Sequence, residues 1–319
     1  MNYNAISFPG LGIGQIKIDP IALNIGDSIS IRWYALIICV GILAAFFVCN
    51  KLRKRLGITE DDFLDCILYT LPIAFIGARL TYVIGDLSSF KSFYDVIAIW
   101  NGGLAIYGGV IFAALSVFVI CRLKKCSFGK MADVMAIGLL IGQIIGRLGN
   151  FVNIEVYGVE TELPWAMGIG YFGEGASMLV HPLFLYEMLW NAIGLILIYG
   201  YFDYRKFNGE AFLWYTAWYG LGRGLLEPLR DPEFNLKIFG VRIMLVLAFA
   251  IFVASVALVV VLRKKSNGFV TTAPVADNYE TQFNITKEDI ENIELSPEEL
   301  EAKKIYDTLE KADKQNEDN

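Results

Sequence analysis

The stretch Gly146–Gly158, GRLGNFVNIEVYG, places four polar side chains at the end of a long apolar segment. Arg147, Asn150, Asn153 and Glu155 fall within a run of nine residues. A charged group at the centre of a membrane costs about 3 kcal/mol unless it faces protein or a wet cavity. The pattern therefore indicates a functional site. The alternative interpretation is a helix end with a snorkelling arginine and a glycine cap.

A second polar stretch, GRGLLEPLRDPE at Gly222–Glu233, follows another apolar segment. Arg223 and Glu227 are spaced i,i+4 and share one helix face. Together with Arg147, Arg223 would supply forked donors that remain charged, from two different helices. Two such guanidinium groups suit the binding of a phosphate.

The alternative to anion binding is a set of structural ion pairs. Arg147 would then pair with Glu155 or with Glu187, and Arg223 would pair with Glu227. The two interpretations are compatible, because a carboxylate that orients an arginine leaves other guanidinium donors for an anion.

The single histidine, His181, opens the stretch HPLFLYE, which ends at Glu187. A lone histidine followed by proline at a helix start is more typical of a cap or packing group than of a catalyst. We expect Glu187 to act by orienting other groups. One histidine and no cysteine pair at ligand spacing predict no metal site, and no glycine-rich nucleotide loop precedes a helix.

These residues are embedded in a strongly apolar chain. The protein has 319 residues, 55% of them hydrophobic, and a mean hydropathy of +0.50. Several apolar runs approach the roughly 20 residues that span a bilayer, so the sequence predicts an all-α integral membrane protein, a bundle of seven transmembrane helices with short interfacial elements. The predicted spans are 29–48, 67–84, 104–120, 131–145, 183–201, 211–226 and 241–262.

Basic residues predict the orientation of this bundle. The runs KLRKR, CRLKKCSFGK, YRK and RKK hold 13 lysines and arginines at alternate ends of the spans. Because positive residues concentrate on the cytoplasmic side, we expect the N-terminus outside, the C-terminus in the cytoplasm and the polar stretches on the outer side. The loop 156–180 has no lysine or arginine, which is typical of a non-cytoplasmic segment.

Three regions are predicted. Residues 1–28 form an N-terminal arm whose alternating isoleucines and turn residues indicate short extended pieces on the membrane surface. Residues 29–265 form the membrane body. Residues 266–319 carry a net charge of −9 and form an acidic, largely disordered cytoplasmic tail with one possible short helix.

GRLGNFVNIEVYG resembles the signature of the prolipoprotein diacylglyceryl transferases, bacterial membrane enzymes that lipidate a cysteine of lipoprotein precursors. The resemblance extends over nearly all of the membrane body, through IRWYALIICVG, GGLAIYGG, HPLFLYE and GRGLLEPLRDPE. It implies transfer of the diacylglyceryl group of phosphatidylglycerol to a lipobox cysteine thiol, with release of glycerol phosphate, as the first step of lipoprotein maturation. It also implies a multi-pass protein of the bacterial cytoplasmic membrane.

The resemblance further implies the partners and the site. The partners are phosphatidylglycerol, prolipoprotein signal peptides with a lipobox cysteine and membrane lipids, with no cofactor, metal or nucleic acid. We predict as catalytic residues Arg147, Arg223, Tyr107, Glu155 and Glu227, of which the resemblance implies all but Tyr107. We predict as substrate-binding residues Tyr34, Asn150, Asn153, Gly158, Gly108, Gly109, Glu187 and Arg230, of which the resemblance implies Tyr34, Asn150 and Gly158.

Two positions depart from the family pattern. Ala35 stands where many members have glycine, a change that we expect packing to absorb. Tyr107 stands where many members have histidine. A histidine with a pKa near 6.5 accepts a proton at neutral pH and a tyrosine near 10 does not, so the general base is left open. We expect Tyr107 to shape the site as a hydrogen-bond donor.

Two other classes of protein fit some of these features. A transporter of lipids or small anions would also carry arginines on its helices, but it usually places its site at the midplane between internal repeats. No internal repeat is detected here, and the polar stretches lie on one side. A non-catalytic lipid-binding scaffold is the third interpretation.

Overall fold

Long helices form most of the structure, a computed structural model that describes residues 4–25, 29–87, 90, 92–98, 102–231, 237–238 and 241–266. The helices are α1 (Trp33–Arg55), α2 (Glu60–Gly85), α3 (Phe93–Ile97), α4 (Ile106–Leu123), α5 (Phe128–Asn153), α6 (Leu183–Tyr201), α7 (Glu210–Leu226) and α8 (Ile243–Lys265). Each of the seven predicted spans falls on one of them. The predicted tail beyond Ser266 and residues 232–236 of the second polar stretch lie outside the described residues.

Six of the described helices are long and apolar enough to cross a membrane: α1, α2, α4, α5, α8, and α6 with the short turn that follows it. This confirms the prediction that the chain is mostly helical, with several helices of the length and composition of membrane spans. The seventh predicted span coincides with α7, which has 17 residues and ends where Glu227 and Pro228 begin the 3-10 helix η5 (Glu227–Leu229). Seven spans and their orientation stay predictions.

Helix boundaries follow local capping signals. The Thr59 hydroxyl accepts the Asp62 amide at the start of α2, and the Ser127 hydroxyl accepts the Lys130 amide at the start of α5. Such caps contribute about 1 kcal/mol each. Helix α5 continues past Ile145, the predicted end of span four, through two more turns to Asn153.

The expectation of a purely α-helical protein is wrong in one region, because a four-stranded sheet is present in the order β2-β1-β5-β6. Its strands are β1 (Asn4–Phe8), β2 (Ile13–Ile18), β5 (Met167–Tyr171) and β6 (Gly175–Val180). Two short hairpins, β3–β4 (Ile21–Ile25, Ile29–Arg32) and β7–β8 (Lys237–Ile238, Val241–Arg242), are separate from it. The predicted extended pieces of the N-terminal arm are thus strands.

Strands β5 and β6 lie in the stretch 156–180, which the sequence predicts to be a loop. Glycines weaken a strand pattern, yet here they permit close backbone approach. A Cβ at Gly168 would lie 2.4 Å from the Ser7 hydroxyl, and one at Gly170 would lie 2.3 Å from the Gly175 carbonyl oxygen. The sheet buries Ile6 and Met167 in a small core, so the arm and this segment fold together.

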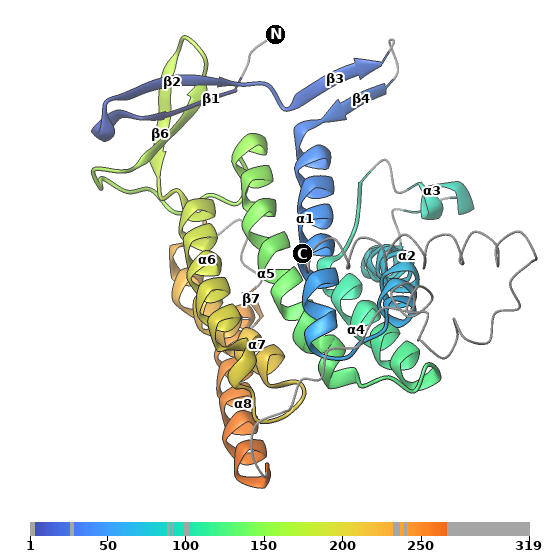
Figure 1. Ribbon diagram of the computed structural model, residues 1–319. Coiled ribbons are helices and arrows are strands. Elements are labelled where there is room, and N and C mark those ends of the chain that lie inside the picture. The colour runs from blue at the N-terminus through green and yellow to red at the C-terminus, as the bar shows by residue number, and fades with distance from the viewer. Residues whose placement is uncertain are drawn as a thin grey trace, which may run out of the picture. The chain divides into compact units, whose positions relative to one another are not determined.

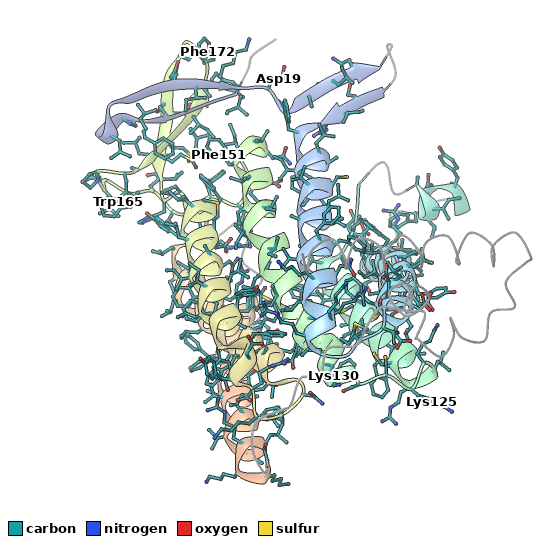
Figure 2. The ribbon with its side chains drawn as sticks, in the orientation of Figure 1. Asp19, Lys125, Lys130, Phe151, Trp165 and Phe172 are labelled. Carbon is teal, nitrogen blue, oxygen red and sulfur yellow. The ribbon has the colours of Figure 1, made fainter. Side chains whose placement is uncertain are left out.

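Helix α5 lies at the centre of the bundle, where it contacts α1, α4, α6 and α7, while α2 pairs with α4 and α7 with α8 (Figure 1). Glycines bring α2 and α4 together, because a Cβ at Gly108 would lie 2.2 Å from the Thr81 hydroxyl. The bundle has two distinct ends. The sheet and Phe151 mark one end, and Lys125 and Lys130 mark the other (Figure 2).

The end marked by Lys125 contains the main core and a buried ion pair. Asp133 on α5 lies 2.8 Å from Arg205, and both side chains are almost fully buried. The second Asp133 oxygen accepts the Phe212 amide, and the first also accepts the Gly209 amide, so one carboxylate caps the start of α7. This contact fixes α7 against α5, and with it the residues at the far end of α7.

Arg79 on α2 is a structural residue rather than a ligand-binding group. It is 8% exposed and donates to the carbonyl oxygens of Val96 at 2.8 Å and of Gly102 and Gly103 at 2.7 Å. These bonds hold the glycine-rich entry into α4. They therefore set the position of Tyr107, the second residue of that helix.

Candidate active site

A cluster of arginines and glutamates lies at the end of the bundle that carries the sheet. Its members come from the last turns of α5, the first turns of α6 and the region where α7 becomes η5. The predicted polar stretches therefore meet in space, although they are far apart in the chain. Figure 2 shows Phe151 on the same last turns of α5, and its ring lies 5.0 Å from that of Phe184 at the start of α6.

Glu187 is the hub of this cluster. Its carboxylate lies 2.8 Å from the Nε of Arg147, 3.6 Å from Nη1 of Arg223 and 3.2 Å from Nη2 of Arg230. The Glu187 side chain is 8% exposed. A buried carboxylate is costly without partners, and three guanidinium groups from three segments supply them. Of the alternatives for Arg147, the structure has the pair with Glu187.

Glu227 is a second buried carboxylate beside the first. It pairs with Arg223 at 3.0 Å with the predicted i,i+4 spacing, and its side chain is 1% exposed. Arg242, the residue before α8, donates to the Glu227 backbone oxygen at 3.4 Å. Arg223 thus forms ion pairs with two carboxylates, which hold its charge between them.

A chain of amide groups extends the cluster along α5. Arg147 donates to the Asn150 oxygen at 2.9 Å, and the Asn150 amide donates to Glu155 at 2.9 Å. The Asn153 amide also donates to Glu155, at 3.4 Å. Asn150 therefore connects Glu155 to Arg147, while Asn153 bonds the same Glu155 oxygen.

The backbone around Glu155 is strained. Ile154 has φ +53° and Val156 has φ +59°, a left-handed conformation on both sides of the glutamate. This conformation is a genuine outlier for β-branched residues and costs on the order of 1–3 kcal/mol at each position. Such strain concentrates at functional sites. It reverses the chain after α5 and turns Glu155 back toward Asn150.

Gly158 positions Arg230. The two residues form an antiparallel bridge, and the Val159 amide donates to the Leu229 oxygen at 2.9 Å. A Cβ at Gly158 would lie 2.7 Å from that same oxygen and 2.7 Å from the Cβ of His181. Only glycine lets the segment after η5 come this close, and this approach brings Arg230 to Glu187.

A reciprocal pair of tryptophans holds α6 and α7 together below the cluster. The rings of Trp190 and Trp218 stack 4.4 Å apart, and each indole N–H donates to the backbone oxygen of the other residue, at 3.1 and 2.9 Å. Gly222 makes room for the Trp190 ring. Trp190 follows Glu187 by one turn, so this contact sets the separation of Glu187 from Arg223.

Arg147 and Arg223 are more accessible than the two glutamates with which they pair. The side chains of Arg147 and Arg223 are 23% and 18% exposed, whereas Glu187 and Glu227 are nearly buried. With Arg230, Arg242 and Glu155 added, four arginines face three glutamates, a formal net charge of +1. One monoanionic group would neutralise this charge.

Crowding of like charges also favours an anion. Burial, and after it the charge of Arg223, lowers the pKa of Arg230 from its ordinary value, while Glu187 and Glu227 oppose this shift. Arginine starts above 12, so it stays protonated at neutral pH. The guanidinium groups therefore repel one another at close range, and an added anion relieves that repulsion.

Tyr34 lies beside the cluster on the first turn of α1. Its ring packs on Gly149, where a Cβ would lie 2.6 Å from it, and the charges of Glu155 and Arg147 act on its hydroxyl. Its predicted role of binding substrate remains a prediction. The glycine explains how α1 approaches α5 at this level.

Tyr107 is 55% exposed on the first turn of α4 and donates to the Met244 sulfur at 2.6 Å. The charges of Arg223, Glu227 and Arg230 act on its hydroxyl. Its neighbours Gly108 and Gly109 lie against α2. The predicted role of these two glycines in substrate binding stays a prediction, since the contacts that they make are between helices.

His181 packs as a structural group. Its Nδ1 lies 3.3 Å from the Tyr186 hydroxyl, its backbone joins Gly158 and Val159, and burial lowers its pKa from the ordinary value. It is therefore neutral at pH 7. Its side chain is one of the groups that leave no room for a Cβ at Gly158.

Three features of the site were missed by the sequence analysis. Arg242 stands beyond the second polar stretch and carries no motif of its own. In the sequence, Trp190 and Trp218 look like two ordinary aromatic residues, although a glycine follows each tryptophan four positions later. The strained turn at Ile154 and Val156 gives no signal, because left-handed positions are usually marked by glycine or asparagine.

Comparison with known proteins points to one family. The family model for prolipoprotein diacylglyceryl transferase matches residues 20–261. Relatives named phosphatidylglycerol–prolipoprotein diacylglyceryl transferase include one from Finegoldia magna, 39% identical over 249 residues that cover 77% of this chain and 97% of the relative. Others come from Streptococcus uberis, 37% identical with 79% and 97% covered, and Lactobacillus delbrueckii subsp. bulgaricus, 38% identical with 78% and 93% covered.

Proposed function

Because the chain belongs to the prolipoprotein diacylglyceryl transferase family, we propose that the cluster around Glu187 is where it performs that transfer. The protein is a transferase that moves a diacylglyceryl group from phosphatidylglycerol to a prolipoprotein, the first step of lipoprotein maturation. The observation that supports this location is the convergence of Arg147, Arg223 and Arg230 on one carboxylate.

The proposed acceptor is the thiol of the lipobox cysteine in the signal peptide. The sulfur attacks a carbon of the diacylated glycerol of phosphatidylglycerol, the one bonded to the phosphate oxygen. A carbon–sulfur bond forms, the carbon–oxygen bond to phosphate breaks, and glycerol phosphate leaves with the bonding electron pair. The thiol proton is released to solvent or to the departing phosphate. The products are a thioether-linked diacylglyceryl peptide and glycerol phosphate.

The arginines act on the leaving group. The phosphodiester carries one negative charge, and the phosphate monoester that leaves gains a second as the carbon–oxygen bond breaks. Arg147 and Arg223 are fixed by Glu187 and Glu227 before the substrate arrives. Donors that are already oriented in a site of low dielectric stabilise developing charge without reorganisation, and removing one typically costs a factor of about 100 to 1,000.

The nucleophile needs little activation. A cysteine thiol with a pKa near 8.5 is already a few per cent thiolate at neutral pH. The net positive charge of the cluster raises that fraction. Glu155, linked to Arg147 through Asn150, orients this arginine, while Asn150, Asn153 and Tyr34 offer hydrogen bonds to the headgroup. Tyr107 borders the site as a donor, and no step requires it to accept a proton.

The proposed placement in the membrane follows the basic residues. We place the protein in the bacterial cytoplasmic membrane with seven spans, α7 included, the N-terminus outside and the C-terminus inside. The cluster then lies on the outer side, where lipoprotein precursors emerge. By the same proposal the N-terminal arm and the sheet are on the outer side, and the acidic tail 266–319 is cytoplasmic.

The experiment incubates the purified protein with phosphatidylglycerol and a synthetic lipobox peptide and follows the peptide mass. We expect a gain of one diacylglyceryl group, with glycerol phosphate released in equal amount. A peptide with serine in place of the lipobox cysteine is the matched control and gains nothing. Lipid flux across vesicles without any change in peptide mass would contradict the proposal.

A further inference from the structure

A groove of about 490 Å³ lies at the opposite end of the bundle from the Glu187 cluster, between α1, α5 and α6. Its volume is within the range of about 300–1,000 Å³ typical of ligand sites. Its apolar lining includes Phe47, Val48, Ile137, Ile141, Leu195 and Ile196. Helices α1 and α6 flank α5, whose isoleucines form the floor.

The walls of the groove face outward into the region that lipid occupies. Phe47 is 66% exposed and Ile196 is 72% exposed, whereas Ile137 on the floor is fully buried. An exposed apolar surface on a membrane helix contacts acyl chains by default. A concave apolar surface contacts an acyl chain on three sides, which increases the apolar area buried for each methylene group of that acyl chain.

One end of the groove is charged. Lys51 and Arg55 lie on the last turns of α1, just past the predicted span, and Arg55 reaches Asp203 after α6 at 3.3 Å. Arg55 also lies 5.7 Å from the Tyr199 ring. The Arg55–Asp203 pair is largely exposed, so it holds its partners weakly. Within the described part of the chain, Lys51 is exposed and has no carboxylate within ion-pair distance.

We propose that this groove binds one anionic phospholipid of the leaflet opposite the Glu187 cluster. An acyl chain lies along the apolar floor, and the headgroup phosphate lies against Lys51 and Arg55. Together with Asp203, these two residues give the groove a net charge of +1, which complements a single phosphodiester charge. Basic pockets between helices at a membrane surface favour anionic headgroups over zwitterionic ones by about 1 kcal/mol for each unpaired charge.

This binding is separate from the transferase reaction. The charged end of the groove, at Lys51 and Arg55, lies on the last turns of α1, and the lining residues on the shared helices that come nearest to the cluster, Ile141 and Leu195, are six residues from Arg147 and eight from Glu187. Because the groove joins α1, α5 and α6, an occupant would also strengthen contacts among the three helices. The proposal therefore assigns a second lipid site with a structural role.

The test uses photo-crosslinking in phosphatidylcholine liposomes. The protein is reconstituted with a trace of phosphatidylglycerol that carries a diazirine in one acyl chain, or with phosphatidylcholine that carries the same chain. Labelled peptides that contain residues 47–55 and 195–199 report the groove. The exposed face of α8, which includes Val253 and Val260, serves as an internal reference for ordinary lipid contact.

We expect the ratio of anionic to zwitterionic labelling to be about fivefold higher in the groove than on α8, the factor expected for one net charge. The double variant Lys51→Gln/Arg55→Gln should lower that ratio to the α8 value. The matched control Lys125→Gln/Lys130→Gln removes two charges at the same end of the bundle (Figure 2) from residues that do not line the groove, and it should keep the preference.

Equal ratios in the groove and on α8 would overturn the proposal, as would a control variant that behaves like the groove variant. The readout does not depend on transfer to a peptide. Labelling of the groove can therefore succeed or fail independently of the proposed active site, whose own labelling appears in separate peptides around Arg147.

Discussion

The carboxylate of Glu187 on α6 lies 2.8 Å from the Nε of Arg147 on α5. The same carboxylate also reaches Arg223 and Arg230, so a single buried glutamate holds three arginines that come from separate parts of the chain. In the proposed reaction these arginines hold the phosphate that leaves, and Glu187 sets their positions.

Removing the charge of Glu187 should therefore impair all three arginines at once. In Glu187→Gln, the amide no longer balances the guanidinium charges, which then repel one another and move apart. We expect the initial rate of diacylglyceryl transfer to fall about hundredfold, similar to the loss of an oriented donor. Glu187→Asp keeps the charge with a shorter reach and should retain intermediate activity. A rate within threefold of wild type in Glu187→Gln would contradict the role of this carboxylate.

Adding a methyl group at Gly158 should displace Arg230 without removing any charge. The new Cβ of Gly158→Ala would lie 2.7 Å from the Leu229 oxygen, so the segment after η5 must shift. We expect activity to fall at least about tenfold while the helices remain folded by circular dichroism. Gly200→Ala is the matched control, because no atom lies within 4 Å of a Cβ there. Equal activity in both variants would show that the close approach is unimportant.

Replacing Tyr107 tests whether its hydroxyl accepts the proton of the thiol. Its hydroxyl donates to Met244, and the proposed reaction does not need it as a base. We expect Tyr107→Phe to keep activity within about tenfold of wild type, since a lost neutral hydrogen bond costs about 1 kcal/mol. The pH dependence of the rate between pH 6 and 9 should match that of wild type, because a hydroxyl that does not act as a base contributes no ionisation to the profile. A loss greater than hundredfold would place the hydroxyl in the chemistry.

The opposite end of the bundle should control stability rather than activity. Asp133→Ala would leave Arg205 buried without its carboxylate and would remove the cap of α7. Breaking a buried pair in this way costs about 3–5 kcal/mol, which should lower the midpoint of thermal unfolding in detergent. Glu60→Ala is a useful comparison, because its partner Arg53 keeps bonds to Asn50 and to the Ile58 oxygen. Similar unfolding midpoints for the two variants would contradict this assignment.

The sequence predicts the helices well because long apolar runs and basic ends report directly on the membrane. It also predicts Arg223 with Glu227, because both residues lie on one helix at a spacing fixed by its geometry. It cannot predict that Glu187 would be the hub, since that contact depends on how α5, α6 and α7 pack. The stacked tryptophans that set this packing lie 28 residues apart and act through glycines on the facing helix.

The sheet and the boundary of α5 were missed for a different reason. Gly168 and Gly170 interrupt the alternation that marks a strand, although they are the residues that let β5 pack between its neighbours. The polar residues after Ile145 resemble a loop, yet they continue as helix because their partners lie across the site. In both places tertiary contacts override the local pattern.

The most direct test of the account compares transfer by Arg147→Lys and Arg223→Lys with that by Arg122→Lys, a change on the last turn of α4 away from the cluster. Lysine keeps the charge but loses the forked donors. We expect the gain in peptide mass to slow at least about hundredfold in the first two variants, with unfolding midpoints near wild type, and to be unchanged in Arg122→Lys. Near-normal turnover in folded Arg147→Lys or Arg223→Lys would contradict the claim that these arginines hold the leaving phosphate.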